Sequence, residues 1–225
     1  MGEILLRAEN IDKHFGITHA LDNVSFTFNK GEIHALIGEN GSGKSTLLKI
    51  IVGKEGYDSG DIIIKNGLKT SGKVTVKASS SGDVTGSTIS CDDFAATANS
   101  SGDVILEKVS CTNFSADASS SGDVSVKNLN AADVSADASS SGDVILAGIC
   151  ENASYRASSS GDVKAKGMKA VNVTASASSS GDVECYVTGS LTAKASSSGE
   201  VAYKGNPKDL SLIHISEPTR PRLIS

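Results

Sequence analysis

Large aromatic residues are scarce in this chain of 225 residues. It has no tryptophan, five phenylalanines and four tyrosines. Three of the phenylalanines (Phe15, Phe26 and Phe28) lie in the first 30 residues. The first 66 residues are rich in isoleucine and leucine, whereas serine, glycine, alanine, valine and aspartate dominate the rest. The composition therefore predicts two unlike parts, and the second part has few large side chains from which to build a core.

Excess positive charge, long apolar runs and a leader-like start are also missing. The formal net charge is −5, which argues against a general role in nucleic-acid binding. No run approaches the 18 apolar residues of a membrane span. The first residues carry no basic, apolar leader, so the chain as written is expected in the cytoplasm. There its four cysteines are expected as free thiols rather than a disulfide framework.

The second part is organised by a repeated heptapeptide, Ala-Ser-Ser-Ser-Gly-Asp-Val. Successive copies are separated by 18 to 20 residues, and a period of this length is typical of solenoids. The turn glycines are Gly82, Gly102, Gly122, Gly142, Gly161, Gly181 and Gly199.

Apolar residues alternate with polar ones on both sides of each turn. Phe114, Ala116 and Ala118 precede one turn, and Val124 and Val126 follow it. Alternation of this kind predicts short, half-buried strands and disfavours a disordered Ser/Gly tract. One repeat cannot bury its own apolar face, so the repeats must stack. The predicted fold is mainly β: a narrow, right-handed, single-stranded parallel β-helix with rungs of about 20 residues, preceded by a small α/β P-loop fragment.

Stacking places equivalent side chains in columns. The turn aspartates form one column, and their mutual repulsion must be relieved. We expect each carboxylate to accept backbone N–H groups in its own turn; the less favoured alternative is bound Ca²⁺. Cys91, Cys111 and Cys150 share another column, where packed free thiols are favoured over a Cys91–Cys111 disulfide. The repeats contain no histidine that could activate their serines.

The first part contains a phosphate-binding loop between an apolar run and a predicted helix. We expect strands at 4–11, 20–28, 31–37 and 61–65, and a helix at 46–52 closed by Gly53. The loop reads Gly-x-x-x-x-Gly-Lys-Ser from Gly38 to Ser45. Backbone N–H groups in such a loop converge on phosphate oxygens, Lys44 reaches the β- and γ-phosphates, and the Ser45 hydroxyl holds Mg²⁺.

This part resembles the beginning of ABC-transporter ATPases, above all those of monosaccharide importers, through residues 13–16, 20–26, 30–50 and 58–62. The resemblance implies an ATP site with Mg²⁺, and ABC permease subunits as partners of a complete ATPase. By the same resemblance, Phe15 stacks on adenine. The expected site consists of Phe15, Gly38, Asn40, Gly41, Ser42, Gly43, Lys44, Ser45 and Thr46, with Ser45 also the metal ligand.

The resemblance stops near residue 66. The glutamine loop, the signature sequence, the Walker B strand ending in Asp-Glu and the switch histidine of that family do not follow. Phosphoryl transfer needs several of these parts together, so we expect at most weak ATP binding, no hydrolysis and no catalytic residue. His34 is expected to pack in a strand, and His14 and His19 to lie on the surface.

The repeats resemble the head domains of autotransporter-type adhesins, which are normally found outside the cytoplasm. The sequence does not indicate a ligand for the solenoid. Residues 211–225 match neither part and resemble translated sequencing adapter. The predicted organisation is a truncated nucleotide-binding fragment (1–67), a β-solenoid (71–205) and a tail (206–225). The chain is predicted to be chimeric or truncated. Its predicted function is that of an ATP-binding half-site without hydrolysis machinery, fused to an adhesin-like solenoid. The alternative is an adhesin-like or Ca²⁺-binding solenoid without nucleotide function.

Overall fold

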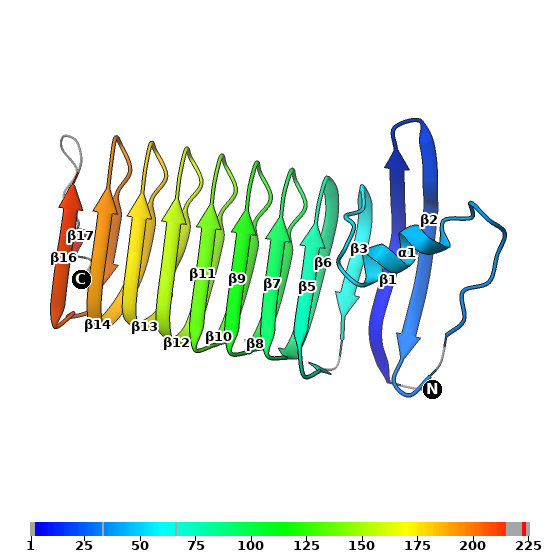
Figure 1. The fold of residues 1–225 in the computed structure, drawn as a ribbon, viewed down its shortest axis with the longest axis horizontal. Coiled ribbons are helices and arrows are strands. Elements are labelled where there is room, and N and C mark those ends of the chain that lie inside the picture. The colour runs from blue at the N-terminus through cyan, green and yellow to red at the C-terminus, as the bar shows by residue number, and fades with distance from the viewer. Residues whose placement is uncertain (1–2, 33, 66, 215–221, 224–225) are drawn as a thin grey trace.

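A stack of parallel β-strands forms most of the molecule, and an antiparallel hairpin and one helix lie at its N-terminal end (Figure 1). The computed structural model describes residues 3–32, 34–65, 67–214 and 222–223. Among these residues, no helix has the length and apolar character needed to cross a membrane.

Each rung of the solenoid supplies strand segments to two series of parallel pairings, which confirms the mainly β, solenoid fold class. The first series contains β6 (Ser81–Ser90), β8 (Val104–Ser110), β10 (Val124–Asn130), the first halves of β12 (Val144–Ala157), β13 (Val163–Ala177) and β14 (Val183–Ala195), then β15 (Val201–Lys204) and β17 (Arg222–Leu223). The second contains β5 (Lys73–Ala78), β7 (Asp93–Ala98), β9 (Asn113–Ala118), β11 (Asp133–Ala138), the second halves of β12, β13 and β14, and β16 (Asp209–His214).

The alternation in sequence becomes alternation between core and surface. Val124 and Val126 of β10 are buried, and Ser125 between them is partly exposed. The core consists largely of columns of valine and alanine, with Phe94 and Phe114 stacked on neighbouring rungs at 5.7 Å between ring centroids. Small side chains therefore produce the narrow core that the composition predicts.

In each turn, the middle serine rather than the glycine has the left-handed backbone. Ser120 has φ 63°, and the middle serines of the other turns lie between 57° and 61°. Gly122 is needed for a different reason: a β-carbon there would lie 2.6 Å from the carbonyl oxygen of Gly102, one rung before. The glycine thus allows successive turns to approach closely.

The N-terminal hairpin extends the first series of strands. It is formed by β1 (Ile4–Phe15) and β2 (Thr18–Asn29), and β1 pairs antiparallel with β3 (Ser59–Ile64). In turn, β3 pairs parallel with β6, aligning Ser59, Gly60 and Asp61 with Ser81, Gly82 and Asp83. The Ser-Gly-Asp-Ile of β3 therefore adds one strand to the parallel stack of the solenoid, although the sequence predicts it as part of the ATPase-like fragment. The short strand β4 (Leu68–Lys69) also pairs with β6.

The segment after the helix covers the exposed edge of the second series. The helix α1 (Lys44–Ile51) ends close to Gly53, whose φ is 69°, as predicted. A β-carbon on Gly53 would lie 2.4 Å from the carbonyl oxygen of Thr75 in β5. Farther along, the Ser79 hydroxyl donates a hydrogen bond to the Tyr57 carbonyl at 2.9 Å. The N-terminal part thus caps a strand edge that would otherwise be open to pairing.

Two expectations from the sequence need correction or qualification. The apolar run at 31–37 is not a strand in its described residues, and Leu36 and Ile37 are exposed. A buried strand needs neighbours on both sides, and the strands near this run pair with each other and with the solenoid instead. His34 accordingly lies outside any strand, with its ring edge-on to Phe28. In the tail, Asp209–His214 forms β16 on the solenoid, whereas 215–221 and 224–225 lie outside the described residues.

Candidate functional site

The phosphate loop is folded around the ammonium group of Lys44. Its Nζ donates to the carbonyl oxygen of Gly38 at 2.8 Å, to that of Glu39 at 2.5 Å and to the Ser42 hydroxyl at 3.1 Å. The loop therefore holds Lys44 with its own oxygens. A phosphate group would have to compete with these hydrogen bonds for the lysine.

The start of α1 has the local form expected of an anion-binding terminus. Gly43 precedes the helix with φ 81°, and no side chain caps the first turn. Ser45 is exposed in that turn, and Thr46 is partly buried. Uncapped N–H groups and the positive end of the helix dipole favour an anion here. A β-carbon on Gly43 would lie 2.3 Å from the Ala20 carbonyl oxygen, so this glycine also seats the loop against β2.

Most of the remaining predicted site residues lie on the outside of the loop. Gly38, Asn40, Gly41 and Ser42 are exposed. Phe15 is 46% exposed at the end of β1, with the Lys13 ammonium 5.1 Å from the centre of its ring. Phe15 is therefore not a core residue, and its exposed ring at the strand end is accessible.

The turn aspartates are linked from rung to rung. Asp83 Oδ1 accepts the backbone N–H of Asp103 at 2.9 Å, and the same bond recurs along the column as far as Asp182 and Glu200. The acceptor role was predicted, but the donor lies in the next rung rather than in the same turn. Each of these bonds gives one carboxylate oxygen of the column a donor from the protein itself.

Charge in this column is only partly compensated. Burial raises the pKa of Asp123, and the carboxylates of Asp143 and Asp103 raise it further, whereas the backbone hydrogen bond from Asp143 and the charge of Lys164 lower it. Lys164 forms ion pairs with Asp143 and, at 3.6 Å, with Asp162. Its hydrogen bond with Asp143 is the main cause that raises the pKa of Lys164.

All four cysteines are free thiols, as expected. Burial raises the pKa of Cys111 to about 12, of Cys185 to about 12 and of Cys150 to about 11. The thiolate is the nucleophilic form of cysteine, so these side chains serve packing rather than chemistry.

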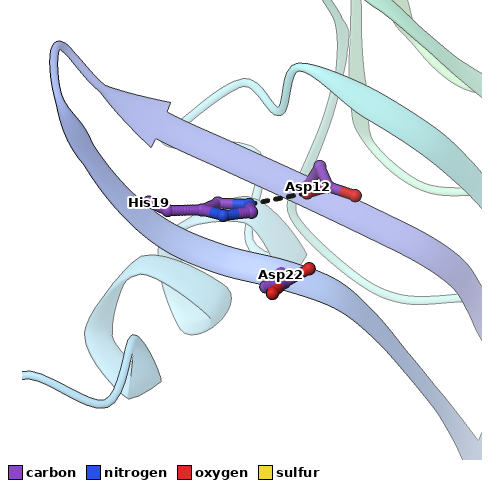
Figure 2. A group of neighbouring side chains, drawn as sticks. All are labelled: Asp12, His19 and Asp22. Carbon is purple, nitrogen blue, oxygen red and sulfur yellow. Dashed lines mark hydrogen bonds and ion pairs between the residues drawn. The ribbon is translucent and has the colours of Figure 1, made fainter.

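Sequence reasoning missed one cluster of side chains that are of metal-ligating type. Asp12, His19 and Asp22 come together on the β1–β2 hairpin (Figure 2). Their spacing matches no ligand motif, because the hairpin pairing, rather than the order along the chain, brings them together.

Fold and loop thus define a β-solenoid that carries a P-loop segment at its N-terminal end. Residues 96–207 match the family described as "Putative auto-transporter adhesin, head GIN domain", and residues 21–126 match the family described as "ABC transporter". One part of the chain is therefore similar to ABC-transporter ATPases, and another part is similar to adhesin head domains. The last part of the second match, from β4 onward, is folded here as solenoid strands.

The curated relatives include ATP-binding proteins of sugar importers and of sulfate/thiosulfate importers. The chain is 54% identical over 71 residues to the xylose import ATP-binding protein of Thermoanaerobacter pseudethanolicus and 49% identical over 72 residues to the ribose import ATP-binding protein of Chromobacterium violaceum. These alignments cover 31% and 32% of the chain, but only 14% of each relative.

Solved structures resemble each part separately. A "putative adhesin" of Bacteroides fragilis has 27% identity and a TM-score of 0.49, covering 56% of this chain and 57% of its own. An ATP-binding cassette of an ABC transporter, in its ADP conformation, has 38% identity and a TM-score of 0.28, covering 30% of this chain and 33% of its own.

Proposed function

We propose that this chain joins an ATP-binding half-site that does not hydrolyse ATP to a structural, adhesin-like β-solenoid. The observation that supports the half-site most directly is the loop around Lys44, which places a lysine, an uncapped helix start and an exposed serine hydroxyl side by side. Lys44 and the helix start would hold the phosphates, Ser45 would hold Mg²⁺, and Phe15 would stack on adenine.

Weak binding is expected for two physical reasons. The Lys44 ammonium must first break its hydrogen bonds to the carbonyl oxygens of Gly38 and Glu39, and the free energy of breaking them reduces the affinity for phosphate. In addition, residues 34–37 lead into the loop without a strand to hold it. A phosphate loop acts by presenting donors in fixed positions, so a loosely held loop binds less tightly.

Hydrolysis is not expected, because the chain after β3 runs directly into the solenoid. In the family, the general base and the carboxylate that helps Ser45 to hold the metal come from elements that pack beside the loop. We therefore assign ATP binding without turnover to this segment. We would expect ABC permease subunits as partners only if the ATPase segment were complete.

Nucleotide binding and turnover should be measured together on the full chain. A fluorescent ATP analogue with Mg²⁺ should bind weakly, Lys44→Ala should abolish the binding, and phosphate release should not exceed the buffer rate. Lys49→Ala is the matched control, because Lys49 is an exposed lysine in the last turn of the same helix. Phosphate release that Lys44→Ala removes would contradict the absence of hydrolysis.

The alternative is a solenoid without nucleotide function, whose N-terminal part serves only as a cap. The edge-covering contacts of Gly53 and Tyr57 with β5 and its turn favour this role. Binding that is undetectable, or equal in the wild type and Lys44→Ala, would select this alternative.

A further inference from the structure

Three metal-type ligands lie close together on the surface of the β1–β2 hairpin (Figure 2). Asp12 comes from β1, and His19 and Asp22 come from β2. One oxygen or nitrogen atom of each lies within 4.8 Å of the others. Among the described residues, this is the one group of at least three such side chains that meets this distance.

Irregular pairing of the hairpin creates the cluster. The register shifts on both sides of Lys13, between Ile11 and Lys13 and again between Lys13 and His14. Asn23 has a left-handed backbone with φ 51°, and its N–H donates to Asp12 Oδ2 at 3.3 Å. The second oxygen of this carboxylate, Oδ1, lies 2.7 Å from His19 Nε2. One oxygen of Asp12 is thus anchored, and the other faces the imidazole.

The imidazole is held from its other side by a second histidine. The rings of His14 and His19 stack with centroids 3.9 Å apart and planes 12° from parallel. Asp58 Oδ2 accepts the backbone N–H of His14 at 2.6 Å and lies 3.6 Å from Nδ1 of its ring, so Asp58 helps to orient the His14 imidazole. A ligand side chain that is oriented in advance loses less freedom on binding.

Among the described residues, no lysine of the hairpin forms an ion pair with either of the two carboxylates. The nearest in sequence, Lys13, directs its ammonium to Asp58 and Glu55 at 3.4 and 3.6 Å. Asp12 and Asp22 therefore bring two negative charges to one histidine, which a divalent cation would balance.

We propose that Asp12, His19 and Asp22 form a binding site for a divalent transition metal of the Zn²⁺ type. Imidazole nitrogen and carboxylate oxygen are both ligands of Zn²⁺, at about 2.0 to 2.2 Å. In the tetrahedral geometry of Zn²⁺, such ligand atoms lie about 3.4 Å from one another. The ligand atoms of the cluster lie within 4.8 Å of one another, with His19 Nε2 and Asp12 Oδ1 at 2.7 Å, so side-chain rotations would complete the site. The imidazole favours Zn²⁺, Ni²⁺ or Cu²⁺ over Mg²⁺ and Ca²⁺, which prefer all-oxygen ligands.

The site has three protein ligands and an open side. Three-ligand zinc sites complete their coordination with water or another small molecule. Because the side chains of His19 and Asp12 are 37% and 27% exposed, the ion can enter without any movement of the backbone.

Zn²⁺ binding should be measured by calorimetry on the full chain without a histidine tag. One Zn²⁺ per chain should bind, and Mg²⁺ at the same concentration should not. His19→Gln and Asp22→Asn should each weaken binding by at least about tenfold. His34→Gln is the matched control, because His34 faces a single carboxylate, Glu32 Oε2, at 3.3 Å.

Two further measurements keep the test decisive. Co²⁺ in place of Zn²⁺ should give a spectrum without the thiolate charge-transfer band, which separates this site from the cysteines. In the wild type, NMR should show the His19 imidazole signal shifting with Zn²⁺ while that of His34 stays in place. Binding of equal affinity in His19→Gln, a thiolate band, or no binding of Zn²⁺ would each overturn the proposal.

Discussion

The ring of Tyr57 lies directly against Gly82, where a β-carbon would be 2.1 Å from its Cε2 atom. Tyr57 is fully buried, and its hydroxyl donates to the carbonyl oxygen of Asp83 at 2.7 Å. In later rungs, the equivalent carbonyl accepts the backbone N–H of the valine one rung before, as Asp103 does from Val84 at 2.8 Å. Tyr57 therefore attaches the N-terminal part to the solenoid through the packing of its ring on Gly82 and the hydrogen bond from its hydroxyl to Asp83.

Two tyrosine substitutions should affect stability in different ways. Tyr57→Phe removes the donor to Asp83 and should lower the free energy of unfolding by about 1 to 3 kcal/mol. Tyr155→Phe should leave it unchanged or raise it by up to about 1 kcal/mol, because the buried Tyr155 hydroxyl has no hydrogen-bond partner among the described residues. Urea unfolding of both variants provides the comparison. A Tyr57→Phe variant as stable as the wild type would show that Tyr57 acts only through packing.

Gly122→Ala should destabilise the solenoid by about 1 to 3 kcal/mol or more. The added β-carbon would meet the Gly102 carbonyl oxygen at 2.6 Å and the Asn99 nitrogen at 2.8 Å. Both are backbone atoms and cannot rotate away. The control is Ser121→Ala at the neighbouring exposed position, which should change the melting temperature little. A harmless Gly122→Ala would mean that successive turns can separate without loss.

The aspartate column can be tested by separating charge from hydrogen bonding. Asp123→Ala removes the acceptor for the Asp143 N–H and should cost about 1 to 3 kcal/mol. Asp123→Asn keeps an acceptor oxygen and removes one of the repelling charges, so it should be tolerated at pH 7. If both variants lose the same stability, the hydrogen bond along the column is not the important interaction.

The pH dependence of stability should report the raised pKa of Asp123. A raised pKa means that the folded state holds the proton more tightly than the unfolded state does. The contribution of Asp123 should therefore become more favourable as the pH falls through its folded pKa, and should be complete below the unfolded value of about 4. The difference in unfolding free energy between wild type and Asp123→Asn, followed from pH 7 downward, measures this contribution. The wild type should gain relative to the variant, and an opposite trend would contradict the assignment.

Thiol alkylation should be slow in the folded chain. Raised pKa values leave little thiolate at about pH 8. The pKa of Cys111 is raised further than that of Cys150, but Cys111 is the least buried of the four thiols, so access should decide the order and Cys111 should react first. Mass spectrometry of iodoacetamide-treated protein, with and without urea, measures the order. Rapid labelling of Cys185 in the folded protein would contradict its burial.

Local patterns predicted the strands well, because their information lies within a few residues. The alternation around Val124 and Val126 indicates a half-buried strand without knowledge of any partner. The hairpin strands, the helix and the left-handed Gly53 were predicted for the same reason. For the site, the loop from Gly38 to Ser45 is recognisable from its own sequence.

Features that depend on partners distant in the sequence could not be predicted. The apolar run at 31–37 resembles a buried strand, but strand formation depends on neighbours that this run does not find. The donor to each turn aspartate comes from the following rung, about 20 residues away in sequence. The Asp12, His19 and Asp22 cluster depends on irregular hairpin pairing, which no local motif records. A signal for β3 was present, since Ser59-Gly60-Asp61-Ile62 repeats the solenoid turn, but the same residues also fit the ATPase pattern.

The rung-to-rung bonds of the aspartate column also bear on how such chains change length. Each carboxylate depends only on the next turn, and each turn glycine only on the turn before. After loss or duplication of one whole repeat, the neighbouring turns would therefore meet through the same kinds of contact as before. Recombination between copies of the heptapeptide can thus shorten or lengthen the rod in whole rungs without a new interface. Smaller changes in repeat length are absorbed by register shifts inside a rung, as in the β10–β12 and β13–β14 pairings.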